Sequence, residues 1–307
     1  MITYIVRRVF QLVITVLFAS MIIYGAMQFV PGDPILAMFF PRIPSQAVYD
    51  NMRAQLGLDK PFIIRYFAYV QNVLIHGDLG ESFKQMRPVN TIIAQNIGHT
   101  AQLALGGILI AMILGIPIGF YAAITRWKIL DHSIMIIALV GVSAPSFWLG
   151  ILLILAFSLA LGWFPTSGIG GLNTLVLPSS TLGLYGAGYL ARFARSSVLE
   201  VKYTDYVTTA RSKGLSEWKV NTRHIFRNAL IPVITMSGLL AGYMLGGAVI
   251  VETVFGRPGI GHVLVNAINQ KDFPLVQGIL LFTVTIFCVV NLIVDLSYAY
   301  IDPRVKY

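Results

Sequence analysis

The residues of this chain that could do chemistry do not form the patterns that catalysis or metal binding requires. Asp131 and His132 are adjacent, and neighbours on a chain rarely point at one nucleophile. Gly141 and Ser143 match part of a serine hydrolase elbow, but its second glycine is missing. The sequence has no G-x-x-x-x-G-K-[ST] phosphate loop and no H-E-x-x-H or Cys/His spacing for zinc. We therefore expect no catalytic residue, no metal and no cofactor in this chain.

Two carboxylates stand in or beside apolar runs and are candidates for a gate or an intramembrane polar site. Asp295 lies within a run, where exposing a charge to lipid costs at least ~2.5–3.5 kcal/mol, so it should face a cavity or a partner. We favour a structural hydrogen bond or snorkelling over a proton relay, because no second buried ionisable group is available to it. Glu252 lies at the end of another run and is interpreted first as an interface residue.

The most informative segment is the basic stretch from Tyr203 to Pro232, which separates two long apolar runs. Gly214 should end a helix there, and Ser216 is a good N-cap for a second one. Apolar residues before the glycine recur at spacings of three and four, so one helix would present a single apolar stripe: Leu199, Tyr203, Tyr206, Val207 and Ala210. The pattern predicts helix, sharp glycine turn and helix, in a cytoplasmic loop that another protein grips.

The composition identifies the solvent of this chain as a lipid bilayer. Of 307 residues, 56% are hydrophobic and only 11% are charged, with a mean hydropathy of +0.76, which is too apolar for a soluble globule. The net charge of +9 lies beside apolar runs instead of on one polar face, so we expect no nucleic acid partner. The single cysteine, Cys288, excludes an intrachain disulfide. These features predict an all-α, multi-pass membrane protein.

Apolar runs of the ~20 residues that cross a bilayer predict about six transmembrane helices. They cover residues 9–29, 101–124, 133–162, 175–192, 229–251 and 275–300. Lys and Arg gather before the first run, between the second and third, in the loop 199–232 and at the end of the chain. The segments 163–174 and 252–274 hold only Arg257 and Lys271. The positive-inside rule then places both termini in the cytoplasm.

These spans divide the chain into three parts. Residues 1–30 form an N-terminal tail and first span, which we expect to be retained as an anchor. Residues 31–98 mix both charge signs, and a region of this length is translocated largely regardless of charge, so we place it outside. It is either a small folded cap or a docking or gating element that faces an external partner. Residues 99–307 form the core, which includes the loop 199–232.

Small residues and prolines predict where the helices pack and bend. Gly115 and Gly119 form a short pair in the second span, which the ordinary glycine content of membrane helices explains equally well. Pro117 and Pro145 permit kinks in the second and third spans. A longer small-residue face in the fifth span predicts a close helix contact at Gly238, Gly242 and Gly246.

Several motifs occur in a familiar order. The loop reads Tyr206-Val-Thr-Thr-Ala-Arg-Ser-Lys-Gly214 and is followed by Arg227-Asn-Ala-Leu-Ile-Pro232. Further motifs are Tyr4-Ile-Val-Arg-Arg8, Pro31-Gly-Asp-Pro34, Gly57-Leu-Asp-Lys-Pro61, His76-Gly-Asp-Leu-Gly80, Val251-Glu-Thr-Val-Phe-Gly256, Pro258-Gly-Ile-Gly261 and Asp302-Pro-Arg-Val-Lys-Tyr307. Together they resemble the B-type permease of the dipeptide/oligopeptide/nickel class of ABC importers, and the loop resembles the EAA loop of that class. Thr208-Thr209 replaces the Glu-Ala of the broader importer motif, a departure usual in the peptide class.

The resemblance implies the type I ABC-importer permease fold in a prokaryotic cell membrane. It implies a non-catalytic subunit that forms half of a translocation path for peptides or a related small solute. The implied partners are a second similar permease, two ATPases that hold ATP and Mg²⁺, and an extracytoplasmic binding protein. The residues that would couple to an ATPase are Tyr203, Tyr206, Val207, Thr209, Ala210, Arg211 and Gly214.

One alternative, a secondary transporter or channel subunit, would need ion-coupling or selectivity residues at the midplane, for which Asp295 alone is weak evidence. The cargo stays open among dipeptides, longer peptides, nickel complexes, glutathione and oligosaccharides.

Overall fold

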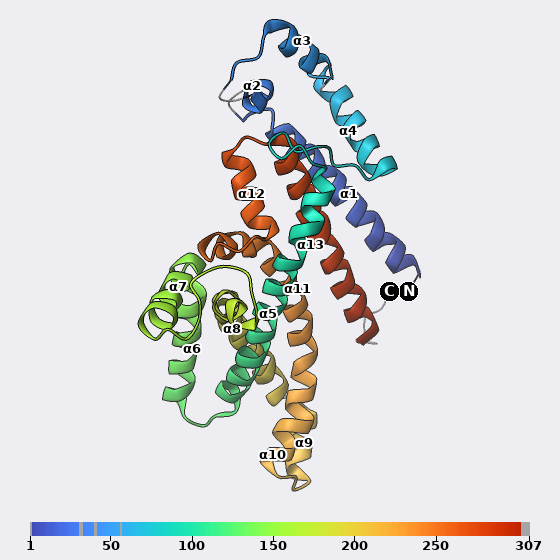
Figure 1. Ribbon diagram of the computed structural model, residues 1–307. Coiled ribbons are helices and arrows are strands. Elements are labelled where there is room, and N and C mark those ends of the chain that lie inside the picture. Colours follow the sequence, from blue (N-terminus) through green and yellow to red (C-terminus); the bar gives the residue numbers. More distant parts are fainter. Residues whose placement is uncertain (1, 31–32, 40–41, 56, 302–307) are drawn as a thin grey trace.

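Helices account for almost all regular structure in the computed structural model, which describes residues 2–30, 33–39, 42–55 and 57–301 (Figure 1). Within these ranges the only β pairing is an isolated bridge between Glu81 and Pro88. Pro31-Gly32, which is half of one sequence motif, and the whole of the motif Asp302–Tyr307 lie outside the described residues. The helices are α1 (Ile2–Ala26), α2 (Pro34–Phe39), α3 (Gln46–Gln55), α4 (Phe62–His76), α5 (Val89–Ile124), α6 (Lys128–Ser143), α7 (Ser146–Leu153), the π-helix η1 (Ile154–Ala160), α8 (Leu172–Lys202), α9 (Asp205–Ser212), α10 (Glu217–Lys219), the π-helix η2 (Val220–Phe226), α11 (Arg227–Val254), α12 (Ile260–Asn269) and α13 (Phe273–Ile301).

Four helices of the described chain are long and apolar enough to cross a membrane, fewer than the six that the sequence predicts. They cover Thr3–Ala26, Val89–Ile124, Glu217–Gly246 and Phe273–Ser297. The pair α6 and α7–η1 makes a fifth only if it counts as one span, because the two parts are bent by 103°. The predicted span 175–192 lies inside α8, which is long enough but carries Arg192, Arg195 and Glu200 toward its end.

The predicted span 133–162 is broken at Pro145 and not merely kinked there, because α6 ends at Ser143 and α7 begins at Ser146. Ala144 adopts an extended conformation (φ −72°, ψ 130°), and Pro145 precedes the first residue of α7. A residue before proline is pushed out of the helical region by the proline ring, so the chain turns here instead of kinking within a helix. By contrast, α5 continues through Pro117.

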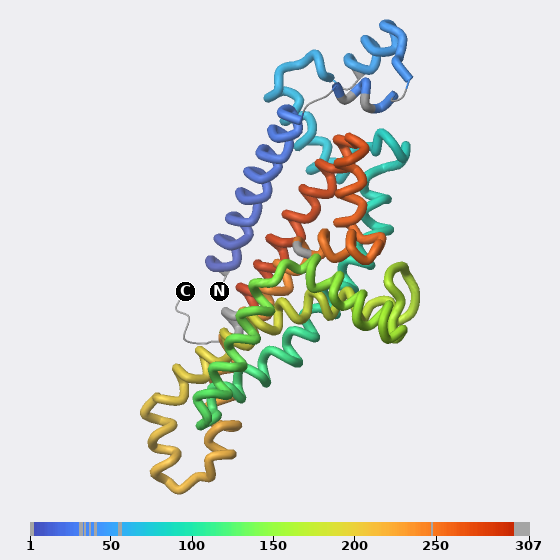
Figure 2. Tube along the Cα trace, turned by 90° about the vertical axis from the view of Figure 1, so that its left-hand side faces the viewer, coloured from blue at the N-terminus to red at the C-terminus, as the bar shows by residue number. Residues whose placement is uncertain are grey.

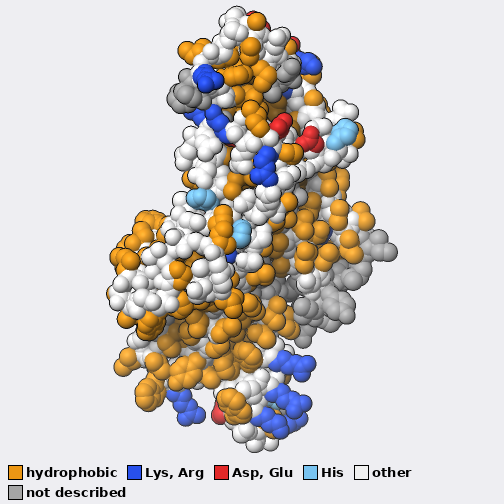
Figure 3. Space-filling view, viewed as in Figure 1, with side chains coloured by type: hydrophobic (Ala, Val, Ile, Leu, Met, Phe, Trp, Pro, Cys, Tyr) orange, Lys and Arg blue, Asp and Glu red, His pale blue; other side chains and the backbone are white. Residues whose placement is uncertain are grey.

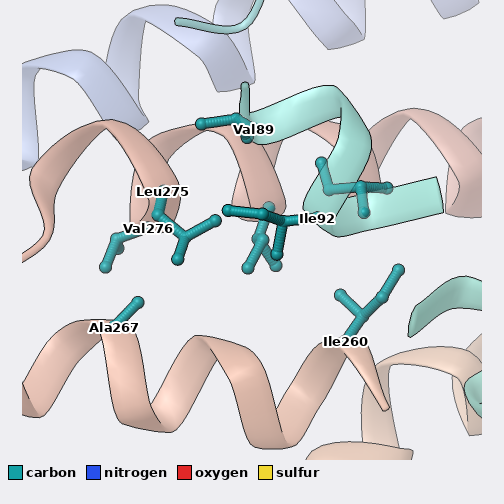
Figure 4. Packing of buried hydrophobic residues seen from close by; sticks show 8 residues of the cluster. Val89, Ile92, Ile260, Ala267, Leu275 and Val276 are labelled. Atoms are coloured by element: carbon teal, nitrogen blue, oxygen red, sulfur yellow. The ribbon is translucent and has the colours of Figure 1, made fainter. Parts of the chain in front are cut away.

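The helix that holds the predicted span 101–124 begins earlier than that span, because α5 already starts at Val89, directly after Pro88. Its 36 residues make a helix roughly 54 Å long, well beyond the hydrocarbon thickness of a bilayer. The N-terminal turns of α5 instead pack against α12 and the start of α13. This contact is an apolar cluster that joins three separate parts of the chain (Figure 4), and it includes Val89, Ile92, Ile260, Ala267, Leu275 and Val276.

The closest helix contact of the core lies between α5 and α8. A Cβ atom on Gly115 would stand 2.7 Å from the carbonyl oxygen of Ala187, and one on Gly119 would overlap the carbonyl oxygen of Ala191. The short glycine pair that seemed ordinary in the sequence is thus required for packing, because backbone atoms cannot move aside as a flexible side chain can.

The longer glycine face of α11 is less uniform than its spacing suggests. A Cβ on Gly238 would lie 2.5 Å from Val294 on α13, and one on Gly242 would make ordinary contacts with α13, the nearest at 3.4 Å from Val290. A Cβ on Gly246 would meet nothing within 4 Å. The face therefore packs against α13 at one end and is open at the other.

The molecule is elongated, with α2–α4 at one end and α9–α10 at the other (Figures 1 and 2). We call residues 33–88 of the first end the cap. Hydrophobic side chains dominate the surface between the two ends, and Lys and Arg gather around the end formed by α9 and α10 (Figure 3). This arrangement agrees with a cap and a loop on opposite sides of a membrane, and the cytoplasmic location of the termini stays a prediction.

Candidate functional site

The candidate site is the segment that joins α8 to α11, and its helix boundaries differ from those predicted. The prediction that one helix runs from Leu199 through Ala210 is wrong, because α8 ends at Lys202 and α9 begins at Asp205. Between them, Thr204 is extended (φ −77°, ψ 153°). Leu199 therefore belongs to α8, and the predicted stripe is divided between two helices.

The apolar side of α9 faces the protein's own core. Val207 is fully buried and Ala210 is 6% exposed, in a cluster with Ala123 at the end of α5 and with Val220 and Ile225 of η2. A short amphipathic helix first buries its apolar residues against its own chain. Val207 and Ala210 thus hold the segment in place and present no surface to another protein.

Three of the predicted coupling residues lie outward, Tyr206 and Thr209 on α9 and Tyr203 in the turn that precedes it. Tyr203 is 76% exposed, and Tyr206 and Thr209 are also exposed. The hydroxyl of Tyr206 accepts a hydrogen bond of 3.0 Å from the Asn228 side-chain amide, which ties α9 to the start of α11. This side is the part of the segment that another protein can reach.

Gly214 makes the turn between α9 and α10. Its φ of +77° lies in the left-handed region that glycine adopts without strain. A Cβ there would meet nothing within 4 Å, so within this chain the conformation alone favours glycine. Arg211 closes the turn through an ion pair of 3.0 Å between its Nε and Oε1 of Glu217.

Two further contacts fasten this end of the protein. Nζ of Lys202 donates a 2.8 Å hydrogen bond to the carbonyl oxygen of Ala123, at the end of α5. Arg195 of α8 binds both carboxylate oxygens of Asp131 on α6 at 2.6 Å. The sequence analysis missed this bidentate pair because its members lie 64 residues apart. As a result, α8 is bonded to both α5 and α6 directly before the segment begins.

Glu252 lies at the other end of α11 and is fully buried. Its Oε2 accepts hydrogen bonds from the backbone N–H groups of Gly261 (2.8 Å) and His262 (3.1 Å), and its Oε1 accepts one from the hydroxyl of Thr100 (2.6 Å). The carboxylate therefore caps the N-terminus of α12, where the helix dipole favours negative charge. The first interpretation of Glu252, as an interface residue at the end of a span, is not supported, because Glu252 is fully buried and these three donors hold it inside the protein.

The capping contact also explains the motif Pro258-Gly-Ile-Gly261. A Cβ on Gly259 would overlap the carboxylate of Glu252. Thr100 completes the arrangement, since its hydroxyl oxygen accepts a 2.9 Å hydrogen bond from the N–H of Ile260. Two sequence motifs and the middle of α5 thus form one buried network.

Asp295 has a partner that the sequence analysis did not identify. Its Oδ2 lies 3.1 Å from Nη1 of Arg8, so that α13 and α1 are joined by an ion pair. Nε of Arg8 also donates to the hydroxyl of Tyr4 at 3.2 Å. A structural interaction accounts for this carboxylate.

Comparison with known proteins identifies the family. The family described as "Binding-protein-dependent transport system inner membrane component" matches residues 115–307, and the family that describes the N-terminal part of such proteins matches residues 1–104. The chain belongs to this family of ABC-importer permeases. It is 42% identical to a putative peptide transport system permease protein of Brucella abortus, over 99% of this chain and 98% of that one. It is 41% identical to the glutathione transport system permease protein GsiC of Escherichia coli O6:H1, over the whole of both.

Solved structures support the fold alone. The inward-facing MetNI methionine ABC transporter matches with a TM-score of 0.54 at 15% identity, over 70% of this chain and 97% of that one. An amino acid ABC transporter crystallised with histidines matches with a TM-score of 0.53 at 17% identity, over 70% and 95%. The expected permease fold and multi-pass membrane location are confirmed.

Proposed function

We propose that this chain is the non-catalytic half of a heterodimeric path that imports short peptides or peptide-like solutes such as glutathione. Two observations support this cargo class. The relatives named for peptide and for glutathione transport are similar to this chain along its full length, and at nearly equal identity. Glutathione is itself a tripeptide, so one solute class covers both names.

The proposed complex adds a second permease, two ATPases and an extracytoplasmic binding protein, and ATP with Mg²⁺ is held by the ATPases. The observation that carries this proposal is the division of α9 into two sides. On its inner side, Val207 and Ala210 pack into the core, while Thr209 on its outer side and Tyr203 in the turn before it are exposed. Such a helix can receive a push from outside and pass it to the core without bending.

The contacts of α9 with its neighbours define how its movement would reach the core. Movement of α9 acts on α5 and η2 through the buried cluster, and on α11 through the bond between Tyr206 and Asn228. Because η2 continues directly into α11, the segment and α11 share one helical body. Closure of the ATPases would thereby tilt α11 and switch the core between two packings.

The first test removes an exposed side chain without touching the core. Tyr203→Ala should lower the amount of ATPase that copurifies with the permease and lower uptake at least fivefold, since Tyr203 is 76% exposed and well placed for a partner. Trp127→Ala is the matched control, because Trp127 is 75% exposed in the turn between α5 and α6. Equal ATPase binding by both variants would contradict the docking role of α9.

A second test uses the conformation of Gly214. Gly214→Val places a β-branched residue at φ +77°, which costs about 1–2 kcal/mol or more and favours rearrangement of the turn. We expect membrane insertion to persist while ATP hydrolysis stimulated by the loaded binding protein is lost. Gly214→Asn should retain activity, because asparagine tolerates the same backbone conformation. Full uptake by the valine variant would remove this turn from the coupling pathway.

A further inference from the structure

A cavity of about 740 Å³ lies between the cap and the membrane-spanning helices. Its wall includes Tyr24 near the end of α1, Met52 of α3, Tyr69 of α4, Phe83 of the loop 77–88, and Gln277 of α13. This volume lies within the range of roughly 300–1,000 Å³ that is usual for small-molecule sites. We call it the cap cavity.

Three buried polar groups in the wall make no well-aligned hydrogen bond with a described residue: Nε of Arg65, the hydroxyl of Tyr69 and Nε2 of Gln277, and the side chains of Tyr69 and Gln277 interact with each other. The Arg65 guanidinium is fixed by its Nη2, which donates a 2.6 Å bond to Oε1 of Gln28. Burial raises the pKa of Tyr69 to about 12, so its hydroxyl keeps its proton. All three groups can therefore donate, and an acceptor oxygen in the cavity would give each of them a hydrogen-bond partner.

The charges of the wall narrow the kind of acceptor. Arg53 and Arg65 are balanced by Asp33 and Glu81, and these four are the only Lys, Arg, Asp or Glu residues in the described wall. Burial acts against ionisation of Asp33, but hydrogen bonds from Tyr49 and from the N–H groups of Ile35 and Leu36 prevail and lower its pKa. A wall that holds two charges of each sign disfavours a dianion such as phosphate and suits a molecule that carries one carboxylate and one ammonium group.

The apolar part of the wall suits varied side chains. Met27, Met38, Met52 and Met86 contribute to it from four different segments, together with Phe273. Methionine is flexible and polarizable, and it is common in sites that accept ligands of different shape. Donors for one carboxylate, balanced charge and a methionine wall therefore occur in one cavity.

We propose that the cap cavity binds a zwitterionic molecule of short-peptide size, with its α-carboxylate on Arg65, Tyr69 and Gln277. The solute class rests on the proposed function, but the site itself requires neither ATP nor the other subunits. It gives the permease its own extracytoplasmic recognition site, in addition to any selection by the binding protein.

The test measures binding of radiolabelled trileucine to the full-length chain, purified with the subunits it retains, in lipid nanodiscs without nucleotide or binding protein. Trileucine with an amidated C-terminus and decanoate are the comparison probes. We expect saturable binding of trileucine, at least tenfold weaker binding of its amide, and no competition by decanoate. Absence of saturable binding at millimolar peptide, equal binding of the amide, or displacement by decanoate would each overturn the proposal.

Matched variants locate the site. Tyr69→Phe removes one donor and keeps the ring, and we expect trileucine to bind three- to tenfold more weakly. Tyr66→Phe is the control on the same helix, because Tyr66 lies outside the cavity wall and its hydroxyl is already bonded to Ser20 at 2.9 Å. Equal affinities in the two variants would place any bound peptide elsewhere.

A second measurement does not depend on loss of a donor. With Cys288 replaced by alanine, Met52→Cys places a thiol in the wall, and Ser45→Cys places one on the exposed cap surface. Trileucine should slow modification of Met52→Cys by an impermeant thiol reagent at least fivefold and leave Ser45→Cys unaffected. If neither rate changes while ATP-driven uptake proceeds normally, the cavity proposal fails and the transport function stands.

Discussion

Removal of the Glu252 carboxylate is the most direct test of how α12 is held. In Glu252→Ala, the N–H groups of Gly261 and His262 and the hydroxyl of Thr100 all lose their acceptor. An unpaired buried donor costs about 1–3 kcal/mol, so three cost roughly 3–9 kcal/mol. Since water can enter the vacated space, we expect the lower end, about 3 kcal/mol, as the loss of local stability of α12.

Glu252→Gln separates the hydrogen bonds from the charge. Its amide oxygen can still accept from Gly261 and His262, but its NH₂ group faces the hydroxyl of Thr100, whose oxygen already accepts from Ile260. The hydroxyl proton of Thr100 is then left without an acceptor on residue 252, and the attraction between the carboxylate and the helix dipole is lost. We expect a cost of about 1–2 kcal/mol for this variant.

Hydrogen–deuterium exchange of the peptide that covers residues 260–269 measures both losses. A cost of about 1–2 kcal/mol predicts exchange roughly 5–30 times faster for the glutamine variant, and about 3 kcal/mol predicts more than about 100 times faster for the alanine variant. Glu200→Ala, at an exposed carboxylate of α8, should leave these amides unchanged. Unchanged exchange in Glu252→Ala would refute the capping role.

Two other predictions follow from the packing and from the charge distribution. Gly119→Leu should prevent a monodisperse, detergent-stable protein from forming, since even a Cβ there overlaps the backbone of α8, whereas Gly246→Leu enters open space and should behave as wild type in size-exclusion chromatography. In a chain with Cys288 replaced, an impermeant thiol reagent outside intact cells should label Ser45→Cys but reach Ser212→Cys only after permeabilisation, and labelling of position 212 in intact cells would reverse the predicted orientation.

The helical class, the long apolar helices and the glycine turn could be predicted because they depend on local signals. Apolar runs select helices in a bilayer, and a glycine followed by a good N-cap ends one helix and begins another. The same local signals misjudged the helix contacts. Gly238, Gly242 and Gly246 form the longer run at this four-residue spacing, yet the shorter pair Gly115 and Gly119 makes the closer contact. Spacing shows which residues share a face, but the neighbour that fills it is set by tertiary packing.

The candidate site shows the same limit. The apolar stripe that includes α9 suggests a docking surface for another protein. That interpretation leaves out the third possibility, which is packing against the chain's own helices. In the folded chain, Val207 and Ala210 find Ala123 and Val220 first. The partners of Glu252 and Asp295 could not be predicted either, since Thr100 and Arg8 are far away in sequence. An amphipathic pattern predicts that one side of a helix is buried, but it does not identify the residues against which that side packs.

The hydrogen bonds that Glu252 makes to the N-terminus of α12 join α11 to a second helix. At one end, α11 continues η2 and is fastened to α9; at the other, its last turn carries the carboxylate that holds the first turn of α12. The apolar cluster then joins α12 to the start of α5 and of α13, beside the cap (Figure 4). A displacement of α9 that tilts α11 must therefore either move α12 with it or break hydrogen bonds worth several kcal/mol. The buried carboxylate therefore resists separation of the first turn of α12 from the last turn of α11.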